Sequence, residues 1–395
     1  MPVEGAYSGL RVLDLGQGVA APYCAMLLAM HGADVVKLEP LEGDWSRGLG
    51  TGYGGAQTAM SAHYNRGKRS VALDLKSPAG REVALLLADR ADVVVENFRP
   101  GVAERLGLGY PALAARNPRL LYLSISGFGA VGPYAQLPCT DSVAQAFSGM
   151  MSVNLGNDRA PHRVGTTIVD TLSGLYAAQA LGVALYARER SGQGRRLDVS
   201  LTQCAAAVLG YKLAEHILEG GAPRALNVPT GVYRTADGWI MIALVKEEQF
   251  PRLATALGRP DLAADPRFAD FAARARHADP LGEILGTILP SDTTAGWLAR
   301  LRAADILADR INGFDDWLAD PHVVATSGAV RVVQPGIGEF RTPRTPGIVA
   351  AADAAMRPAP GIGEDGRAIL AELGLTDEAI GRLAADGVLG LPELA

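Results

Sequence analysis

The sequence predicts an α/β protein whose N-terminal half forms a parallel β-sheet covered by helices. Short apolar runs rich in Val, Leu and Ile alternate with longer stretches that repeat apolar residues at helical spacing. Because parallel strands need a crossover between them, this alternation favours strand–helix–strand units over hairpins. The length of 395 residues exceeds one ordinary domain, so a second, smaller domain is expected.

The elements of the first half follow in order. Expected strands occupy residues 10–15, 35–39, 71–75, 92–96 and 120–124. Expected helices begin near Pro22, where proline suits a first helical turn, and cover residues 78–89 and 102–106. The strands are nearly continuous apolar runs, as is typical of strands buried on both faces.

A longer helix is expected from about Leu172 to Arg190, directly after the acidic residue Asp170. By pattern alone, Asp170 is an N-cap, since aspartate is favoured there and its charge suits the helix dipole. A chemical role is the alternative. The apolar run 172–187 is rich in Gly and Ala and is expected to fall short of a membrane span.

The remaining chain predicts a small α/β domain and a return to the first. A strand after Gly192 is followed by a helix over 201–218, a linker over 220–231 and a hairpin over 232–242 turned at Asp237-Gly238. Helices over 247–257 and 293–304 and a helical tail from Gly366 complete it. The expected domains are 1–220, 221–335 and, returning to the large domain, 336–395.

Composition narrows the class of protein. A hydrophobic fraction of 48% and a charged fraction of 20% are typical of a globular enzyme, and the net charge of −5 argues against nucleic-acid binding. The three cysteines are odd in number and widely spaced, which fits a reducing compartment. Residues 1–5 show no signal-peptide pattern. We therefore expect a cytoplasmic protein without membrane attachment or a metal site.

One short motif suggests a nicotinamide-dependent oxidoreductase. Residues 16–21 read GxGxxA after a strand, and Glu39 follows about 20 residues later, as in dinucleotide-binding proteins. The pattern is permissive in a chain with 47 glycines, and no hydride-transfer residues are evident downstream. It supports a Rossmann-like layer more than it supports NAD binding.

Longer motifs carry a more specific signal. They are VLDL at 12–15, GADVVKLEP at 32–40, NRGKRSVALDLK at 65–76, ENFRPGV at 96–102, SGFG at 126–129, the spaced Gly165, Asp170 and Gly174, and PGIGED at 360–365. In this order, over nearly the whole chain, the sequence resembles the class III coenzyme A transferases, which include formyl-CoA and carnitinyl-CoA transferases.

The resemblance implies a fold, a reaction and partners. The large domain would be Rossmann-like, and two ring-shaped chains would interlock as a homodimer. Asp170 would attack an acyl-CoA thioester, passing through an aspartyl anhydride and an aspartyl-CoA thioester, and CoA would move to a free carboxylic acid. Coenzyme A is thus a substrate, and no prosthetic group is implied.

The resemblance also places further residues in the site. Asp141 stands where relatives carry a second acidic residue; the alternative is an N-cap of a helix over 142–147. Near the pantetheine end it places Gln17, Gly18, Val19 and Ala20, and around the nucleotide Leu73, Lys76, Asn97, Phe98 and Arg105. Basic side chains there suit phosphate groups.

Three departures limit the substrate assignment. Racemases of the superfamily carry a histidine where this chain has Thr140, and His162 has no motif support, so we expect it to be structural. Formyl-CoA transferase has a glycine run where residues 245–249 read VKEEQ, and a Gln where this chain has Val19. We therefore predict no formyl-CoA/oxalate specificity. An α-methylacyl-CoA racemase, an NAD-dependent oxidoreductase and a non-catalytic CoA-binding regulator stay as alternatives.

Overall fold

The computed structural model describes residues 5–155, 160–221 and 227–392, and it divides into two compact units. Unit 1 combines Met1–Gly210 with Thr326–Ala395, and unit 2 is Tyr211–Ala325. The expected division at 335/336 would fall inside an antiparallel hairpin of β10 (Ala329–Gln334) and β11 (Gly338–Pro343). Because the two strands pair along their length, the chain re-enters unit 1 before this hairpin. Within the expected linker 220–231, residues 222–226 lie outside the described residues.

Unit 1 is built on a seven-stranded sheet in the order β12-β3-β2-β1-β4-β5-β6. Its strands are β1 (Arg11–Asp14), β2 (Asp34–Glu39), β3 (Lys68–Leu73), β4 (Val93–Glu96), β5 (Leu121–Ser126), β6 (Arg195–Ser200) and β12 (Leu389–Gly390). All neighbours are parallel except β12, which runs antiparallel to β3 at the edge. The chain moves outward from β1 to β3 and then returns to lay β4 beside β1. The direction of winding therefore reverses between β1 and β4.

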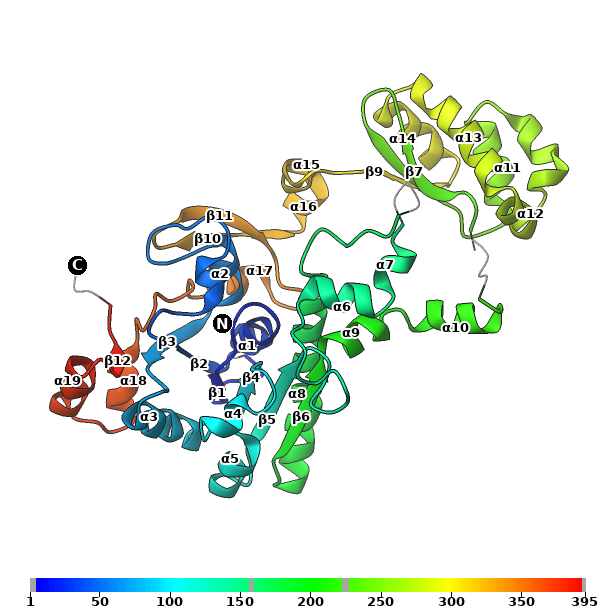
Figure 1. Cartoon of the computed structure of the whole chain (residues 1–395). Coiled ribbons are helices and arrows are strands. Elements are labelled where there is room, and N and C mark those ends of the chain that lie inside the picture. The colour runs from blue at the N-terminus through cyan, green and yellow to red at the C-terminus, as the bar shows by residue number, and fades with distance from the viewer. Residues whose placement is uncertain (1–4, 156–159, 222–226, 393–395) are drawn as a thin grey trace. The chain divides into compact units, whose positions relative to one another are not determined.

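The sheet separates two hydrophobic cores, because successive side chains of a strand point to opposite faces. Val12, Val93 and Leu121 pack on the side of α1 (Ala20–Met30) and α8 (Ile168–Ser191). Their neighbours Leu13, Val94 and Tyr122 pack on the opposite side with α3 (Pro78–Asp89), α5 (Tyr110–Arg116), α18 (Gly366–Glu372) and α19 (Asp377–Ala385). Figure 1 shows α8 running beside β5 and β6. The predicted parallel sheet with helices on its faces is confirmed.

The long helix α8 begins four residues before its expected start. The β-branched residues Ile168 and Val169 form its first turn, although their type favours a strand, because Val169 is fully buried in the first core. By length and composition, α8 is the one helix in the described ranges that could cross a membrane, so the expectation that this run falls short is wrong. Its buried face packs on α1, β5 and α9 (Leu201–Ala207).

Unit 1 also contains shorter elements that the sequence did not reveal. They are α2 (Ala59–Tyr64), α7 (Met150–Val153) and α17 (Ala350–Ala354), while the helices expected over 102–106 and 142–147 are α4 (Val102–Arg105) and α6 (Asp141–Phe147). Thr58 and Ser61 form a capping box at the start of α2. The helix expected over 201–218 is two helices separated at residues 208–209, of which α9 belongs to unit 1 and α10 (Gly210–Leu218) belongs to unit 2 from Tyr211 onward.

Unit 2 combines a three-stranded antiparallel sheet with helices. The predicted hairpin turned at Asp237-Gly238 is confirmed as β7 (Thr230–Arg234) and β8 (Trp239–Ala243), and β9 (Leu307–Arg310) pairs with β8. The helices are α11 (Gln249–Ala256), α12 (Phe271–Arg276), α13 (Ala278–Ile288), α14 (Thr294–Ala303), α15 (Phe314–Ala319) and α16 (Pro321–Ala325). After β8, Gln249 Oε1 accepts hydrogen bonds from the backbone N–H groups of Val245 and Lys246. The Gln249 side chain therefore fixes the conformation of this loop, which lacks glycines.

Candidate active site

The loops that follow β1 and β4 meet at the carboxyl edge of the sheet, where the winding reverses. The backbone N–H of Gln17, after β1, donates to Asn97 Oδ1 at 2.8 Å, and Asn97 Nδ2 donates to the Gln17 carbonyl at 2.8 Å. The Asn97 side chain therefore satisfies both backbone hydrogen-bonding groups of Gln17. Open α/β sheets bind their ligands in the crevice at this reversal point.

The turn Gly16-Gln17-Gly18 is held by further buried side chains. Gly16 donates its N–H to Asp14 Oδ1 at 2.9 Å, and Lys37 Nζ donates to the Gly16 carbonyl at 2.7 Å. Gly18 donates to both oxygens of Asp44, at 2.9 and 3.1 Å. Gly18 has φ +78°, and a Cβ there would lie 2.1 Å from the Trp45 ring, so only glycine fits.

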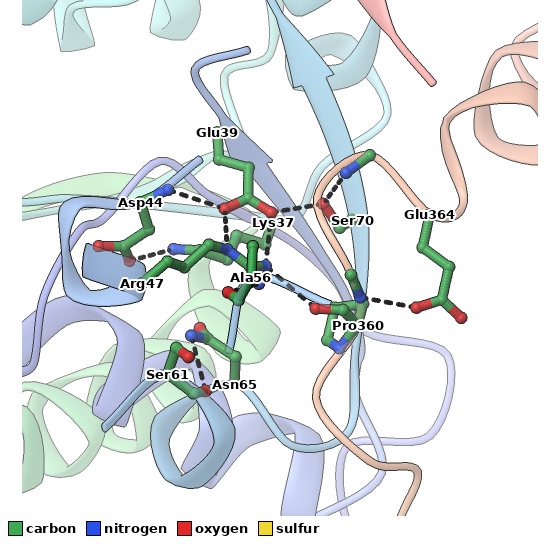
Figure 2. A network of polar contacts seen from close by, with 12 residues as sticks. Lys37, Glu39, Asp44, Arg47, Ala56, Ser61, Asn65, Ser70, Pro360 and Glu364 are labelled. Carbon is green, nitrogen blue, oxygen red and sulfur yellow. Dashed lines mark hydrogen bonds and ion pairs between the residues drawn. The ribbon is translucent and has the colours of Figure 1, made fainter. Parts of the chain in front are cut away.

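Lys37 and Asp44, which bond this turn, belong to a buried network of charged side chains (Figure 2). Lys37 and Asp44 pair at 2.9 Å with both side chains fully buried, and Arg47 binds Glu39 with two hydrogen bonds of 2.8 Å. Burial opposes the charge of Lys37, but nearby carboxylates, Asp14 and Asp44 foremost, raise its pKa above the ordinary value. The Lys37 charge in turn lowers the pKa of Asp44 against the effect of burial. Both groups therefore stay ionised and hold the turn in place.

This bonding argues against the dinucleotide interpretation of the motif. In a dinucleotide site, the amides of the glycine turn face a pyrophosphate, and an acid about 20 residues on binds the ribose. Here the amides of Gly16, Gln17 and Gly18 all donate to side chains of the protein, and two of those acceptors are carboxylates. Glu39 is buried and committed to Arg47. The turn has neither free donors nor a free ribose acceptor.

Asp141 caps the long helix α8. Its Oδ2 accepts the backbone N–H groups of Val169 at 2.6 Å and Asp170 at 3.2 Å, in the first turn of α8. The N-cap of α8, Thr167, makes no side-chain capping bond. Asp141 is the first residue of α6, whose N-cap is Thr140, so the N-cap alternative for Asp141 is wrong for its own helix. The carboxylate acts instead at the start of another helix.

Gln145 holds the Asp141 carboxylate from the other side. It is fully buried, its Nε2 donates to Asp141 Oδ1 at 2.6 Å, and its Oε1 accepts the Val164 N–H at 2.8 Å. Asp141 therefore accepts hydrogen bonds on both oxygens. Sequence analysis missed Gln145, although its i+4 spacing from Asp141 on a helix is a usable signal.

Asp170 is the third residue of α8, so the N-cap reading is also wrong for this residue. Its carboxylate accepts no hydrogen bond from the part of the chain that the structure describes. Burial and, second, the charge of Asp141 raise its pKa to about 7. Burial, followed by the charges of Asp170 and Asp141, raises the pKa of the nearby Cys139 thiol to about 11, which keeps that thiol protonated at neutral pH.

The face of α8 that carries Asp170 lies against the first turn of α1. Thr167, Asp170 and Gly174 are spaced by three and four residues and so share one face. A Cβ on Gly174 would lie 2.7 Å from the Ala20 carbonyl oxygen and 2.9 Å from the Tyr23 ring. The carboxylate therefore shares a neighbourhood with the helix that begins where the Gly16–Gly18 turn ends.

The other residues predicted to bind CoA divide into two groups. Val19, Ala20 and Leu73 are buried, with the last two in the cores, so only their backbones could reach a ligand. Lys76 and Arg105 are exposed and form no ion pair within the described ranges. They follow β3 and β4, which end at the same edge of the sheet as the Gln17 turn.

The remaining candidates have structural positions. Phe98 packs against the second core, and its N–H donates to Glu96. His162 is exposed, and its N–H donates to the Asn154 carbonyl at 2.9 Å. Across residues 5–155, 160–221 and 227–392, no group of three or more potential metal ligands converges.

Comparison with known proteins decides the family. The sequence model of CoA-transferase family III matches residues 7–366. The chain belongs to this family. It is 35% identical over 390 residues to the succinyl-CoA–D-citramalate CoA-transferase of Chloroflexus aurantiacus, covering 96% of this chain and 97% of that protein.

Two further comparisons agree with this family III membership. The succinate–glutarate CoA-transferase of Agrobacterium fabrum is 35% identical, with 93% of this chain and 95% of that protein covered. The crystal structure of a CaiB/BaiF family protein from Brucella suis matches with a TM-score of 0.82 and 34% identity, over 94% of this chain and all of that one. The resemblance to class III CoA-transferases is confirmed.

Proposed function

We propose that this family III enzyme moves coenzyme A from an acyl-CoA to a free carboxylic acid, with Asp170 as the nucleophile. The observation that carries the proposal is the state of Asp170. It is a carboxylate with no hydrogen-bond donor among the residues that the structure describes, with a pKa of about 7, on the face of α8 that meets the first turn of α1. Perturbed carboxylates of this kind are characteristic of reactive sites.

The reaction uses covalent catalysis in balanced steps. The ionised Asp170 attacks the thioester carbonyl, which forms a mixed anhydride and releases the CoA thiolate. The thiolate attacks the aspartyl carbonyl of that anhydride, which forms an aspartyl-CoA thioester and releases the first acid. The acceptor carboxylate then attacks this thioester, and the thiolate that leaves attacks the acceptor's carbonyl in the new anhydride. The new acyl-CoA leaves, and Asp170 is restored as a carboxylate.

Asp141 has a supporting part in this scheme. Its carboxylate is fixed by Gln145 and by two amides of α8, so its negative charge stays beside Asp170. That charge makes the ionised Asp170 a more basic, and hence more reactive, carboxylate. We therefore assign Asp141 the position of a charge that tunes the nucleophile.

Coenzyme A would bind along the carboxyl edge of the sheet. The backbone of residues 17–20 is expected at the pantetheine end, where Gln17 is held by Asn97. The unpaired Lys76 and Arg105 would meet the phosphates, beside Phe98 and the backbone of Leu73. The strand order, with its reversal at β1 and β4, supports a Rossmann-like description of this unit.

The assembly and location are part of the proposal. Leu175, Val183 and Tyr186 are 52%, 66% and 67% exposed on α8, which supports burial of this helix against a second chain in a homodimer. A partner chain, rather than a bilayer, would then cover the apolar face. The three cysteines are unpaired, which supports a reducing, cytoplasmic compartment.

Trapping the intermediate tests the function. The enzyme is incubated with an acyl-CoA and treated with hydroxylamine or borohydride, and the adduct is located by peptide mass spectrometry. We expect it on Asp170, and we expect Asp170→Ala to abolish CoA transfer while retaining CoA binding. An adduct on another residue, or transfer at the normal rate by Asp170→Ala, would contradict the assignment. Exchange of an α-proton without CoA transfer would favour the racemase alternative, and CoA binding with neither reaction would favour the regulator.

A further inference from the structure

A cavity of about 520 Å³ lies beside the start of α8 in unit 1. Its described lining consists of Thr167 and eight residues from the segment 49–64. Thr167 is the N-cap of α8 and precedes Asp170 by three residues, on the same face of the helix. The cavity therefore opens next to the candidate nucleophile rather than at a remote surface.

Two tyrosines tie this cavity to the candidate active site. Tyr64 lines it, with its hydroxyl 3.5 Å from Thr167 Oγ1. Tyr23 packs edge-on against Tyr64, with ring centroids 5.7 Å apart, and also meets the position of Gly174. Thr167 and Gly174 flank Asp170 on its face, and both contact this tyrosine pair. The tyrosine pair therefore connects the cavity to the face of α8 that carries Asp170.

The lining is uncharged. Leu49, Met60 and Ala59 supply apolar surface, and the polar groups are hydroxyls and one imidazole. No lysine or arginine is among the described lining residues. The imidazole belongs to His63, whose ring lies 3.1 Å from Thr342 Oγ1; burial and the charge of Arg66 lower its pKa to about 4. His63 is therefore neutral at physiological pH.

The cation whose charge acts on His63 is already paired with a carboxylate. Arg66 is 1% exposed and pairs with Asp353 at 3.0 Å, so it presents no free charge to the cavity. Where a bound acyl-CoA closes this open pocket, a second carboxylate on the substrate chain would lose water without gaining a cationic partner from the described lining residues. Such a transfer is unfavourable, because a desolvated charge needs a counter-ion or several donors.

Building on the proposed function, we propose that this cavity binds the carbon chain of the transferred acid and selects chains without a second charge, such as simple monocarboxylic acids. The two transferases named above, from Chloroflexus aurantiacus and Agrobacterium fabrum, are named for dicarboxylic acids. The uncharged cavity would separate this chain from them in substrate class while the reaction stays the same.

Self-exchange measures this preference without knowledge of the natural acceptor. Butyryl-CoA with ¹³C-labelled butyrate is compared with succinyl-CoA and ¹³C-labelled succinate, and pentanoyl-CoA with glutaryl-CoA in the same way. Within each pair the chain length is equal and only the distal charge differs. We expect kcat/KM for label exchange to be at least about tenfold higher for the uncharged member.

Two variants move the preference in a chosen direction. Met60→Lys introduces a cation into the lining and should shift the ratio toward succinyl-CoA, whereas the neutral control Met60→Gln should leave it unchanged. Leu49→Lys, at a half-exposed position, repeats the test if Met60→Lys does not fold. Equal or faster exchange of the dicarboxylic members by the unmodified enzyme, or no response to either lysine, overturns this inference while leaving CoA transfer intact. No exchange with any pair overturns the proposed function itself.

Discussion

The carboxylate of Asp141 binds the backbone amide of Asp170 at 3.2 Å, and its charge adds to the larger effect of burial in raising the pKa of the Asp170 side chain to about 7. One group thus stabilises the start of α8 and sets the ionisation of the residue that the helix carries. The two effects have the same cause, a negative charge fixed at a helix N-terminus. They can be separated by replacing the charge while keeping a hydrogen-bond acceptor.

The pH dependence of the reaction should report this arrangement. Attack requires ionised Asp170, so kcat/KM for an acyl-CoA should fall below a pKa near 7, by about tenfold per pH unit. Asp141→Asn keeps an oxygen that accepts the α8 amides but removes the charge, so this acid limb should move to lower pH. Asp198→Asn, on strand β6, serves as the control with an unmoved limb. An acid limb at the same pH in Asp141→Asn would contradict the charge effect.

The same shift predicts a pH-dependent stability. The folded pKa of Asp170, about 7, lies above its ordinary value of 3.8, so the folded state binds the proton more tightly. Its contribution to the free energy of unfolding is therefore greatest below about pH 4 and is lost as pH rises through about 7. Asp170→Asn does not titrate and should exceed the natural protein in stability at about pH 8, by at most about 4 kcal/mol.

Urea denaturation at pH 8 and pH 4, at one fixed protein concentration, measures this difference. We expect the advantage of Asp170→Asn at pH 8 to shrink toward zero at pH 4. An advantage that is equal at both pH values would mean that burial of the Asp170 charge is not its source.

The close contact between α8 and α1 predicts an intolerant glycine. In Gly174→Ala, the new methyl group would lie 2.7 Å from the Ala20 carbonyl oxygen, so the helices must separate. We expect a loss of about 1–3 kcal/mol in the free energy of unfolding, together with a fall in kcat/KM. Gly182→Ala, in the same helix, meets only the Tyr7 hydroxyl at 3.3 Å and should be neutral or mildly stabilising. Equal effects of the two substitutions on kcat/KM would contradict a specific role for the close contact between Gly174 and Ala20.

The bond between Asn97 and Gln17 predicts a specific effect on substrate binding. Asn97→Ala frees the Gln17 backbone, so we expect the KM for acyl-CoA to rise several-fold, with a stability loss of about 1–3 kcal/mol. Asn117→Ala is a matched control, because Asn117 also bonds two backbone groups, those of Ala91 and Arg119. It should lose similar stability without a change in KM. A rise in KM for both variants would indicate general loosening.

Much of the fold could be predicted because its signals are local. The strand at Val93–Glu96 is apolar on both faces, since Val94 points into one core and Val95 into the other. The start of α8 could not be placed locally. Ile168 and Val169 favour extended backbone, and the helix begins there because Val169 is buried in the first core and Asp141, 28 residues earlier, caps the helix.

The candidate site shows the same division between local and long-range information. Motifs identified Asp170 and Asp141, but not that Gln145 joins Asp141 to the Val164 amide. They also named Leu73 without revealing that its side chain belongs to the core. A motif records which residues recur and not which part of each residue, backbone or side chain, is presented to a ligand.

The turn at Gly16–Gly18 binds a carboxylate of its own chain, that of Asp44. In a nucleotide-binding turn a phosphate accepts the glycine amides, whereas here the Asp44 carboxylate accepts the Gly18 amide. Because Asp44 belongs to the same chain, its effective concentration at the turn is higher than that of a dissociable ligand. The turn is therefore shaped when the protein folds, and a substrate that arrives beside it meets a backbone whose conformational entropy has already been lost. A short glycine motif therefore does not reveal that the Gly18 amide already donates its hydrogen bond to Asp44, 26 residues later in the chain.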